Sequence, residues 1–436
     1  MGLCASSRRC GADGWKFFVT AKPENIPAYI AVTAAYWAFM LTDGALRMLV
    51  LLHFHILGFS PVQLAYLFIL YEVAGIITNA TAGWLAARFG LAITLHAGLF
   101  LQIFALLALS QLSSDWSITA SVIYAMCVQG LSGVAKDLTK MSSKSAVKLL
   151  APDENSSLFK WVALLTGAKN AIKGLGFLVG AASLALFGFV PSILGMAVLL
   201  AIILIATLIR MPKGLPNGIK NTRFRDVFST SPHVNRLSLA RVFLFGARDV
   251  WFVVGIPIFY YAALSDGSEA GNRLAFFSIG SFMAVWTILY GFVQAQAPRM
   301  LRNLGDDMAH FVSVTGFWVK ILTAIPALLA VVLLFYPEPN TSVTIVLTLG
   351  LLAFGAVFAV NSSLHSFLIL ALTTGKRVTM DVGFYYMANA AGRLLGTLLS
   401  GLSYQIGGLA LCLATATLML AASWIATNRL NQSLTL

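Results

Sequence analysis

Two similar stretches, AKNAIKGLG at 168–176 and ANAAGRLLG at 388–396, lie in separate halves of a chain of 436 residues. Aligned without gaps, they place Lys173 against Arg393 and Gly176 against Gly396. Each stretch lies in an apolar run of about 20 residues or longer, which is enough to cross a ~30 Å hydrocarbon core as a helix. The sequence therefore predicts a membrane protein built from two related halves.

Composition supports the same class for the whole chain. Apolar residues make up 59% and charged residues 10%, with a mean hydropathy of +0.85, whereas about 25% of a soluble domain is charged. Long apolar runs recur from end to end, so the chain is not a soluble body with one anchor. A β-barrel would show alternating segments of ~10 residues, and none are found. We predict an all-α membrane protein embedded in a lipid bilayer.

Twelve transmembrane helices are predicted. They cover 28–54, 61–87, 91–110, 117–140, 159–186, 190–209, 237–263, 274–296, 309–336, 342–370, 381–406 and 408–428. A polar segment rich in proline and glycine follows the sixth span and divides them into two six-helix pseudo-repeats. We predict a cytoplasmic N-terminal tail at 1–27, an N-terminal bundle at 28–210, a cytoplasmic linker at 211–236 and a C-terminal bundle at 237–430.

The charge distribution predicts the orientation. The net charge is +13, which in a soluble protein would suggest nucleic acid as a partner. In this chain the excess has two other sources, namely cytoplasmic loops and cations within the helices. If the N-terminus is cytoplasmic, the inner segments hold nearly all the loop cations and the outer loops hold one clear cation, Arg273. We therefore predict that both termini are cytoplasmic and that no nucleic acid is bound.

Charged residues at the middle of the spans are candidate functional residues, because each costs at least ~2.5–3.5 kcal/mol to insert. The mid-depth set is Asp43, Arg47, Glu72, Lys169, Lys173, Arg248, Asp249 and Arg393. Cations outnumber acids, so pairing every acid leaves cations without protein partners. An unpaired cation in a low dielectric is costly, and arginine does not lose its proton. This excess predicts a water-filled central cavity that attracts a small anionic substrate.

These residues receive separate candidate roles. The substrate-binding candidates are Arg47, Lys136, Lys169, Lys173, Arg248 and Arg393, and the proton-coupling candidates are Asp43, Glu72 and Asp249. The alternative is that they form structural ion pairs. Asp43 and Arg47 are spaced i, i+4 and could pair on one helix face. Arg248 and Asp249 are adjacent and are not expected to face each other, so each would need another partner.

Other motifs are weaker. Lys136 begins a basic stripe with Lys140, Lys144 and Lys148, which either draws anions toward the cavity or anchors the helix at the membrane surface. Gly176, Gly180, Gly392 and Gly396 form small-xxx-small patterns that favour close helix packing. The four cysteines are too scattered for a disulfide framework. No Cys/His metal spacing, nucleotide loop or nucleophile elbow is found, so we expect no metal, no cofactor and no enzyme activity.

Four strings resemble a specific family of transporters. They are LTDGALRMLVLLHFH at 41–55, QGLSGVAKDLTKMSSK at 129–144, FKWVALLTG at 159–167 and LFGARDVWFVVG at 244–255. Together they resemble the organoarsenical efflux permeases of the ArsJ type, in the major facilitator superfamily. The resemblance covers roughly residues 28–430.

The resemblance implies a plasma (inner) membrane exporter in arsenate resistance. In that family, glyceraldehyde-3-phosphate dehydrogenase uses arsenate in place of phosphate to make 1-arseno-3-phosphoglycerate, and the permease extrudes this product. That cargo is a polyanion, and it would require the excess of cations found within the spans. The alternative within the superfamily is an organophosphate or carboxylate exchanger. A membrane-embedded enzyme or a lipid flippase is disfavoured because the sequence shows no catalytic constellation. An exporter of lipophilic cations is disfavoured because the excess charge within the spans is positive.

Overall fold

The computed structural model describes residues 26–89, 91–113, 115–150, 155–210, 229, 231–300, 308–338, 340–373 and 378–435. Most of the predicted tail and of the predicted linker lies outside these residues. Every regular element in the described part is a helix, as the sequence predicted.

Among the described residues, the first half of the chain contains seven helices that make six crossings. They are α1 (Ile26–Ile56), α2 (Pro61–Tyr66), α3 (Ile69–Phe89), α4 (Leu91–Leu109), α5 (Ile118–Leu150), α6 (Asn155–Phe187) and α7 (Phe189–Arg210). The second predicted span corresponds to α2 and α3 together. Ser60 begins this span with a capping box, since its side chain accepts from the Gln63 amide and Gln63 accepts from the Ser60 amide.

The part of the second half that the structure describes contains six helices with a short π-helical segment. They are α8 (Pro232–Val250), the π-helix (Trp251–Gly255), α9 (Ile256–Leu264), α10 (Glu269–Met300), α11 (Met308–Phe335), α12 (Thr341–Leu372) and α13 (Val378–Thr435). The seventh crossing is α8, the π-helix and α9 together. It begins at Pro232 behind the N-cap Ser231, so the helix starts before the predicted boundary at 237.

α13 contains the last two crossings. Its helical conformation is interrupted at Gly407 and Gly408, and Gly408 has a φ of 60°, which glycine adopts without steric cost. Beyond this break the chain folds back, because Ser403 and Thr415 hydrogen-bond at 3.1 Å. Residues twelve apart in one straight helix would be separated by about 18 Å. The predicted boundary between the spans ending at 406 and beginning at 408 is thus confirmed, and so is the fold of twelve membrane-spanning helices.

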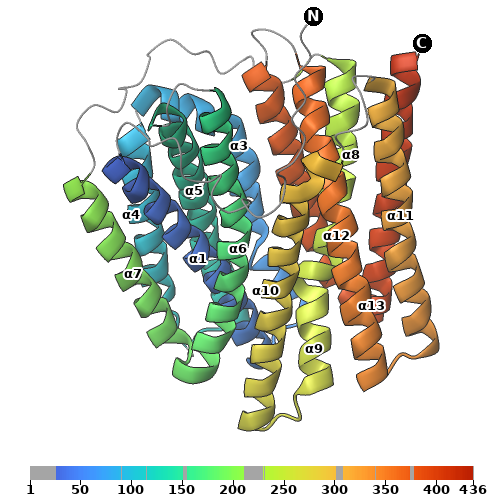
Figure 1. Ribbon diagram of the computed structural model, residues 1–436. Coiled ribbons are helices and arrows are strands. Elements are labelled where there is room, and N and C mark those ends of the chain that lie inside the picture. The colour runs from blue at the N-terminus through green and yellow to red at the C-terminus, as the bar shows by residue number, and fades with distance from the viewer. Residues whose placement is uncertain are drawn as a thin grey trace, which may run out of the picture.

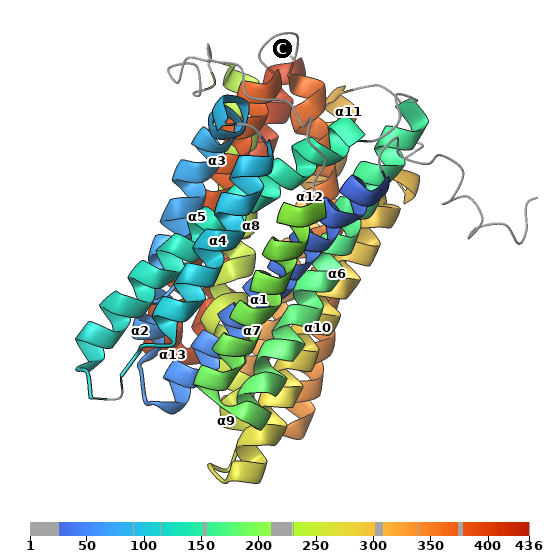
Figure 2. The ribbon, with the colours of Figure 1, turned by 90° about the vertical axis from the view of Figure 1, so that its left-hand side faces the viewer.

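The helices form one elongated bundle with the two halves side by side (Figure 1). The beginning of α1 and the end of α13 lie at the same end of the bundle, here named the terminal end (Figure 1). α6 of the first half lies beside α10 of the second in two views (Figures 1 and 2). α1 and the α8–α9 crossing are the most buried spans, so each half contributes one central helix.

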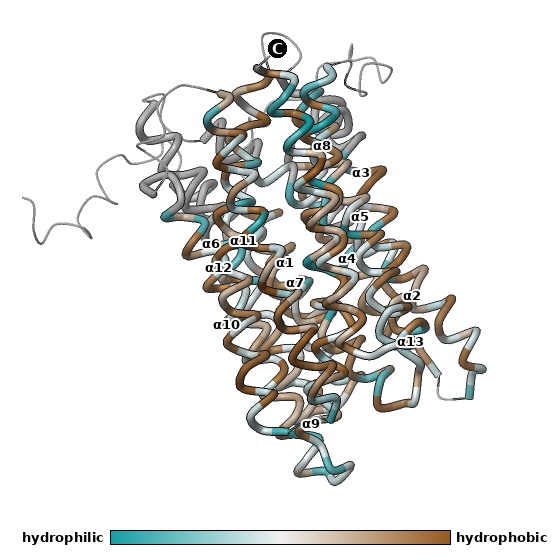
Figure 3. The backbone as a smooth tube through the Cα atoms, turned by 90° about the vertical axis from the view of Figure 1, so that its right-hand side faces the viewer, coloured by the Kyte–Doolittle hydropathy of each residue, from teal (hydrophilic) through white to brown (hydrophobic). Residues whose placement is uncertain are grey.

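The outer surface of the bundle is apolar. Large hydrophobic side chains such as Ile209, Phe335 and Leu418 are more than two-thirds exposed, and hydrophobic colour follows most of the helix lengths (Figure 3). In a soluble protein such a surface would be a liability. Here it is the surface that contacts lipid tails.

Glycines hold the central helices close together in the same way in both halves. A Cβ at Gly176 or Gly180 would overlap the backbone of α1, at Leu41 and Ala45. A Cβ at Gly396 would overlap the backbone of α8 at Gly246. The small-xxx-small patterns therefore pack α6 against α1 and α13 against α8, as predicted. The two halves repeat this packing.

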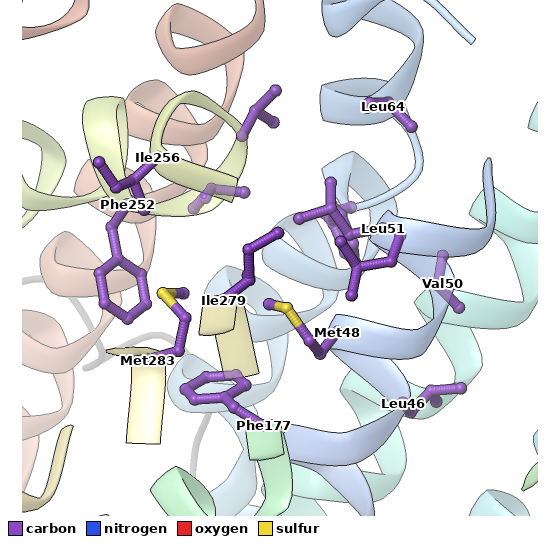
Figure 4. Packing of buried hydrophobic residues seen from close by; sticks show 14 of the residues in the cluster. Leu46, Met48, Val50, Leu51, Leu64, Phe177, Phe252, Ile256, Ile279 and Met283 are labelled. Carbon is purple, nitrogen blue, oxygen red and sulfur yellow. The ribbon is translucent and has the colours of Figure 1, made fainter. Parts of the chain in front are cut away.

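Apolar side chains from both halves meet in the half of the bundle away from the terminal end, here named the opposite end. Met48, Phe177, Phe252, Ile279 and Met283 are buried there and point toward one another (Figure 4). The Val62 amide at the start of α2 also donates to Gln405 of α13 at 3.4 Å. The two halves are thus closed against each other at the opposite end.

Candidate substrate-binding cavity

A cavity of about 260 Å³ lies between the two halves. Its charged lining residues are Asp43, Arg47, Glu72, Lys136, Asp137, Lys140, Lys169, Lys173, Arg241, Arg248, Asp249 and Arg393. Eight are cations and four are carboxylates, which is a formal excess of four positive charges. The lining residues lie in the middle of the helices and toward the terminal end, so the cavity lies on the terminal side of the apolar closure.

Asp43 of α1 is the centre of the first cluster. Its Oδ2 pairs with Lys173 Nζ of α6 at 2.7 Å, and its Oδ1 accepts from the Tyr71 hydroxyl at 2.5 Å. The Tyr71 ring in turn lies under Lys136 of α5, whose Nζ is 4.0 Å from the ring centroid. Asp43 is 3% exposed, so its charge is balanced inside the protein rather than by bulk water.

Glu72 of α3 is the centre of a second cluster that joins the halves. Its Oε1 lies 3.3 Å from Arg47 Nη1 of α1 and 2.6 Å from Arg393 Nη2 of α13. Arg393 also donates from Nε to Asp249 Oδ2 of α8 at 3.4 Å. A single buried carboxylate thus holds one arginine from each half.

The two halves place equivalent charges in equivalent positions. Lys173 pairs with Asp43 in the first half, and Arg393 pairs with Asp249 in the second. The alignment of 168–176 with 388–396 matches these two cations. The internal repeat in the sequence is therefore also a repeat of a charged contact between the fifth and first helices of each half.

The structure brings together all nine candidate residues predicted from the sequence. Each of the six substrate-binding candidates and the three proton-coupling candidates lines the cavity. Two details of the pairing differ from expectation. Asp43 and Arg47 pair with other residues rather than with each other. Arg248 does reach its neighbour, because its flexible side chain folds back so that Nε lies 2.6 Å from Asp249 Oδ1.

Asp137 and Lys140 of α5 line the cavity nearer the terminal end. Asp137 accepts from Thr78 at 2.5 Å and from Lys140 at 3.3 Å, and Lys140 also donates to Asn79 at 3.0 Å. The predicted stripe therefore faces the cavity at its first two positions. The side chains of Lys144 and Lys148 lie outside the described residues.

Arg241 of α8 was not among the residues predicted from the sequence, although it is 4% exposed and lines the cavity. The predicted span began at 237, so Arg241 fell near a membrane boundary, whereas α8 begins five residues earlier, at Pro232. The available signal was the spacing to Arg248, because residues seven apart share a helix face. Tyr290 and Asn389 also line the cavity. In the described part of the chain no group of His, Cys, Asp and Glu could hold a metal ion.

Twelve membrane-spanning helices in two related halves, with a charged cavity at mid-depth, define a polytopic membrane transporter. Residues 28–397 match the model of the Major Facilitator Superfamily. The chain belongs to this superfamily. This confirms the superfamily to which the sequence strings pointed, and it indicates a transporter of small molecules rather than an enzyme.

Solved structures share the fold. A mutant of the nucleoside transporter NupG aligns with a TM-score of 0.68 at 15% identity, covering 94% of this chain and 100% of that one. A structure described under proton dependent oligopeptide transporters aligns with a TM-score of 0.68 at 13% identity, covering 94% of this chain and 99% of that one. Among curated proteins no match is found. At these identities the likeness shows the fold and leaves the cargo open.

Proposed function

We propose that this protein is a secondary active exporter of an organic polyanion. The observation that carries the proposal is the formal excess of four positive charges on the cavity wall. Buried cations without counter-ions are costly, and arginine remains charged at any physiological pH. A solute with several negative charges restores the balance. The proposed ligands are Arg47, Lys136, Lys169, Lys173, Arg248 and Arg393.

Transport proceeds by alternating access in this proposal. The apolar contacts of Met48, Phe177 and Phe252 close the opposite end (Figure 4), while the cavity lies on the terminal side of them. The bias in loop charge favours a cytoplasmic terminal end, and in this proposal the conformation accepts cargo from the cytoplasm. Rocking of the two bundles, 28–210 and 237–430, would then open the opposite end.

Glu72 is the best placed of the three proton-coupling candidates. It holds Arg47 of its own half and Arg393 of the other half through the same oxygen. Protonation of Glu72 would remove its negative charge, so that Arg47 would lose its carboxylate and Arg393 would keep only Asp249. Asp43 and Asp249 each hold a cation of their own half and are the other two candidates.

The proposed cargo is 1-arseno-3-phosphoglycerate, and the proposed location is the plasma membrane. The strings at 41–55, 129–144, 159–167 and 244–255 resemble the ArsJ-type permeases, and the arsenate and phosphate groups of this cargo suit the charge of the cavity. Glyceraldehyde-3-phosphate dehydrogenase would supply it. An organophosphate or carboxylate exchanger is the second candidate, because the same excess of cations would accept those anions.

Growth in arsenate tests this proposal. An efflux-deficient host that expresses the chain should tolerate arsenate, and co-expression of glyceraldehyde-3-phosphate dehydrogenase should increase the tolerance. Arg248→Ala and Arg393→Ala should each abolish it at near-normal membrane abundance. Arg273→Gln is the matched control, because Arg273 is half exposed and pairs with Glu269 far from the cavity. Absence of tolerance, with the protein present in the membrane, would contradict the arsenical cargo.

A further inference from the structure

Apart from Lys169, the eight cations of the cavity fall into two groups by their contacts with carboxylates. Five of them lie within ion-pairing distance of a carboxylate, namely Arg47, Lys140, Lys173, Arg248 and Arg393. Lys136 and Arg241 have no carboxylate at that distance among the described residues. Lys136 belongs to the first half and Arg241 to the second. Each half therefore contributes one buried cation whose charge no contacting carboxylate balances.

Arg241 is held by neutral groups. Its Nε donates to Asn389 Oδ1 at 3.0 Å, and its Nη1 reaches Ser362 at 3.4–3.5 Å. The guanidinium Cζ lies over the rings of Phe245 and Tyr385, 3.8 Å and 5.0 Å from their centroids. These contacts fix the orientation of the guanidinium without neutralising it. Because Arg241 is 4% exposed, solvent does not neutralise it either.

Lys136 is held in a comparable way. It is 8% exposed, and its Nζ lies 4.0 Å from the ring centroid of Tyr71. The Tyr71 hydroxyl is occupied by Asp43, so the ring is fixed in place below the ammonium group. An aromatic face attracts a cation by its quadrupole, but it carries no net charge. The Lys136 ammonium group thus also lines the cavity without a carboxylate in contact among the described residues.

We infer that Lys136 and Arg241 form a two-point anion site that recognises a small organic molecule with two separate oxyanion groups, one for each half of the transporter. This inference rests on the proposed function, because it takes an organic anion as the cargo. Arg241 presents a planar fork that suits the two oxygens of a phosphate, arsenate or carboxylate. Lys136 presents a point charge to the other group.

The ion-paired cations of the cavity are less available to a ligand than Lys136 and Arg241. Arg47, Lys173, Arg248 and Arg393 are already held by Asp43, Glu72 and Asp249, so a ligand must compete with a carboxylate to reach them. Lys136 and Arg241 are available without that competition. A molecule with one oxyanion group satisfies only one of them, whereas a molecule with two connects the halves.

Binding of a matched pair of ligands tests the inference. 3-Phosphoglycerate carries a phosphate and a carboxylate, whereas glycerol 3-phosphate has a hydroxymethyl group in place of the carboxylate. Titration calorimetry on the full chain in lipid nanodiscs would give both dissociation constants. The wild type should bind 3-phosphoglycerate more tightly by at least about tenfold, since one charge-assisted contact is gained. Lys136→Gln and Arg241→Gln should each reduce that preference to near unity.

Two further variants separate charge from structure. Arg241→Lys keeps the positive charge and should retain part of the preference for 3-phosphoglycerate. If Arg241 acted only through its packing, the lysine variant would lose the preference as the glutamine variant does. Lys320→Gln is the matched control, because Lys320 also lies over a ring, with Nζ 5.0 Å from that of Trp424, but does not line the cavity. It should keep the full preference.

The outcomes are distinct. If the wild type prefers 3-phosphoglycerate and the two glutamine variants keep that preference, the two-point site is refuted while an anion exporter remains. If the wild type binds neither compound, the two-point site and the proposed function fail together. Loss of preference in both glutamine variants, with retention in Lys320→Gln, is the result that the structure predicts.

Discussion

The ion pair between Lys173 and Asp43 predicts a measurable energetic coupling. Lys173 Nζ lies 2.7 Å from Asp43 Oδ2, and the two side chains are 19% and 3% exposed. Breaking a buried pair on one side leaves an uncompensated charge and costs about 3–5 kcal/mol. Lys173→Met should therefore lower the free energy of unfolding by about 3 kcal/mol, at the lower end of that range because Lys173 retains some exposure.

The double variant should recover most of this loss. Asp43→Asn together with Lys173→Met removes both charges, and the asparagine still accepts a hydrogen bond from Tyr71. The coupling energy of the double-mutant cycle should be about 2 kcal/mol or more, since contacting charged pairs reach 0.5–3 kcal/mol. Unfolding in mixed micelles with increasing denaturing detergent measures each free energy.

The exposed pair of Arg273 and Glu269 provides the control cycle. Its atoms are 2.9 Å apart, yet the side chains are 51% and 84% exposed, so its coupling should stay below about 1 kcal/mol. Additive effects of the Asp43 and Lys173 substitutions would refute the reasoning, because they would show that the buried contact contributes no more than an exposed one.

Three other predictions concern the interfaces. Glu72→Gln removes the negative charge that holds Arg47 and Arg393, so it should lower the unfolding temperature. It should also weaken the dependence of transport on pH, which counterflow at two pH values measures. An unchanged dependence of transport on pH argues against Glu72 as the proton-coupling residue. Gly180→Ala should cost about 1–3 kcal/mol by overlap with the backbone of α1, whereas Gly195→Ala, which meets nothing, should be neutral or slightly stabilising. Val62→Cys with Gln405→Cys, joined by a short thiol crosslinker, should stop transport, and continued transport would contradict closure at that end.

The sequence was sufficient for the membrane spans because a ~30 Å apolar core imposes a long apolar run on every crossing. It also pointed to the cavity residues, since a charge such as Glu72 in an apolar run is costly and therefore conspicuous. The break in α13 at Gly407 and Gly408 falls at the predicted boundary between the last two spans. These features are local, so local sequence reveals them.

The partners of the charges could not be derived in the same way. Glu72 meets Arg393 across more than three hundred residues of chain, and only the packing of α3 against α13 brings them together. Arg241 was missed because the start of α8 depends on the cap at Ser231 and Pro232 rather than on hydropathy. Arg248 reaches Asp249 through a side-chain rotamer that residue spacing does not specify.

The sign of the transported charge is the central claim, and transport by the purified protein tests it most directly. Proteoliposomes should show saturable counterflow of labelled 3-phosphoglycerate, and their uptake of the lipophilic cation tetraphenylphosphonium should not exceed that of protein-free liposomes. That result would agree with a cavity whose lining carries four more cations than carboxylates. Saturable transport of the cation without transport of the anion would contradict the account.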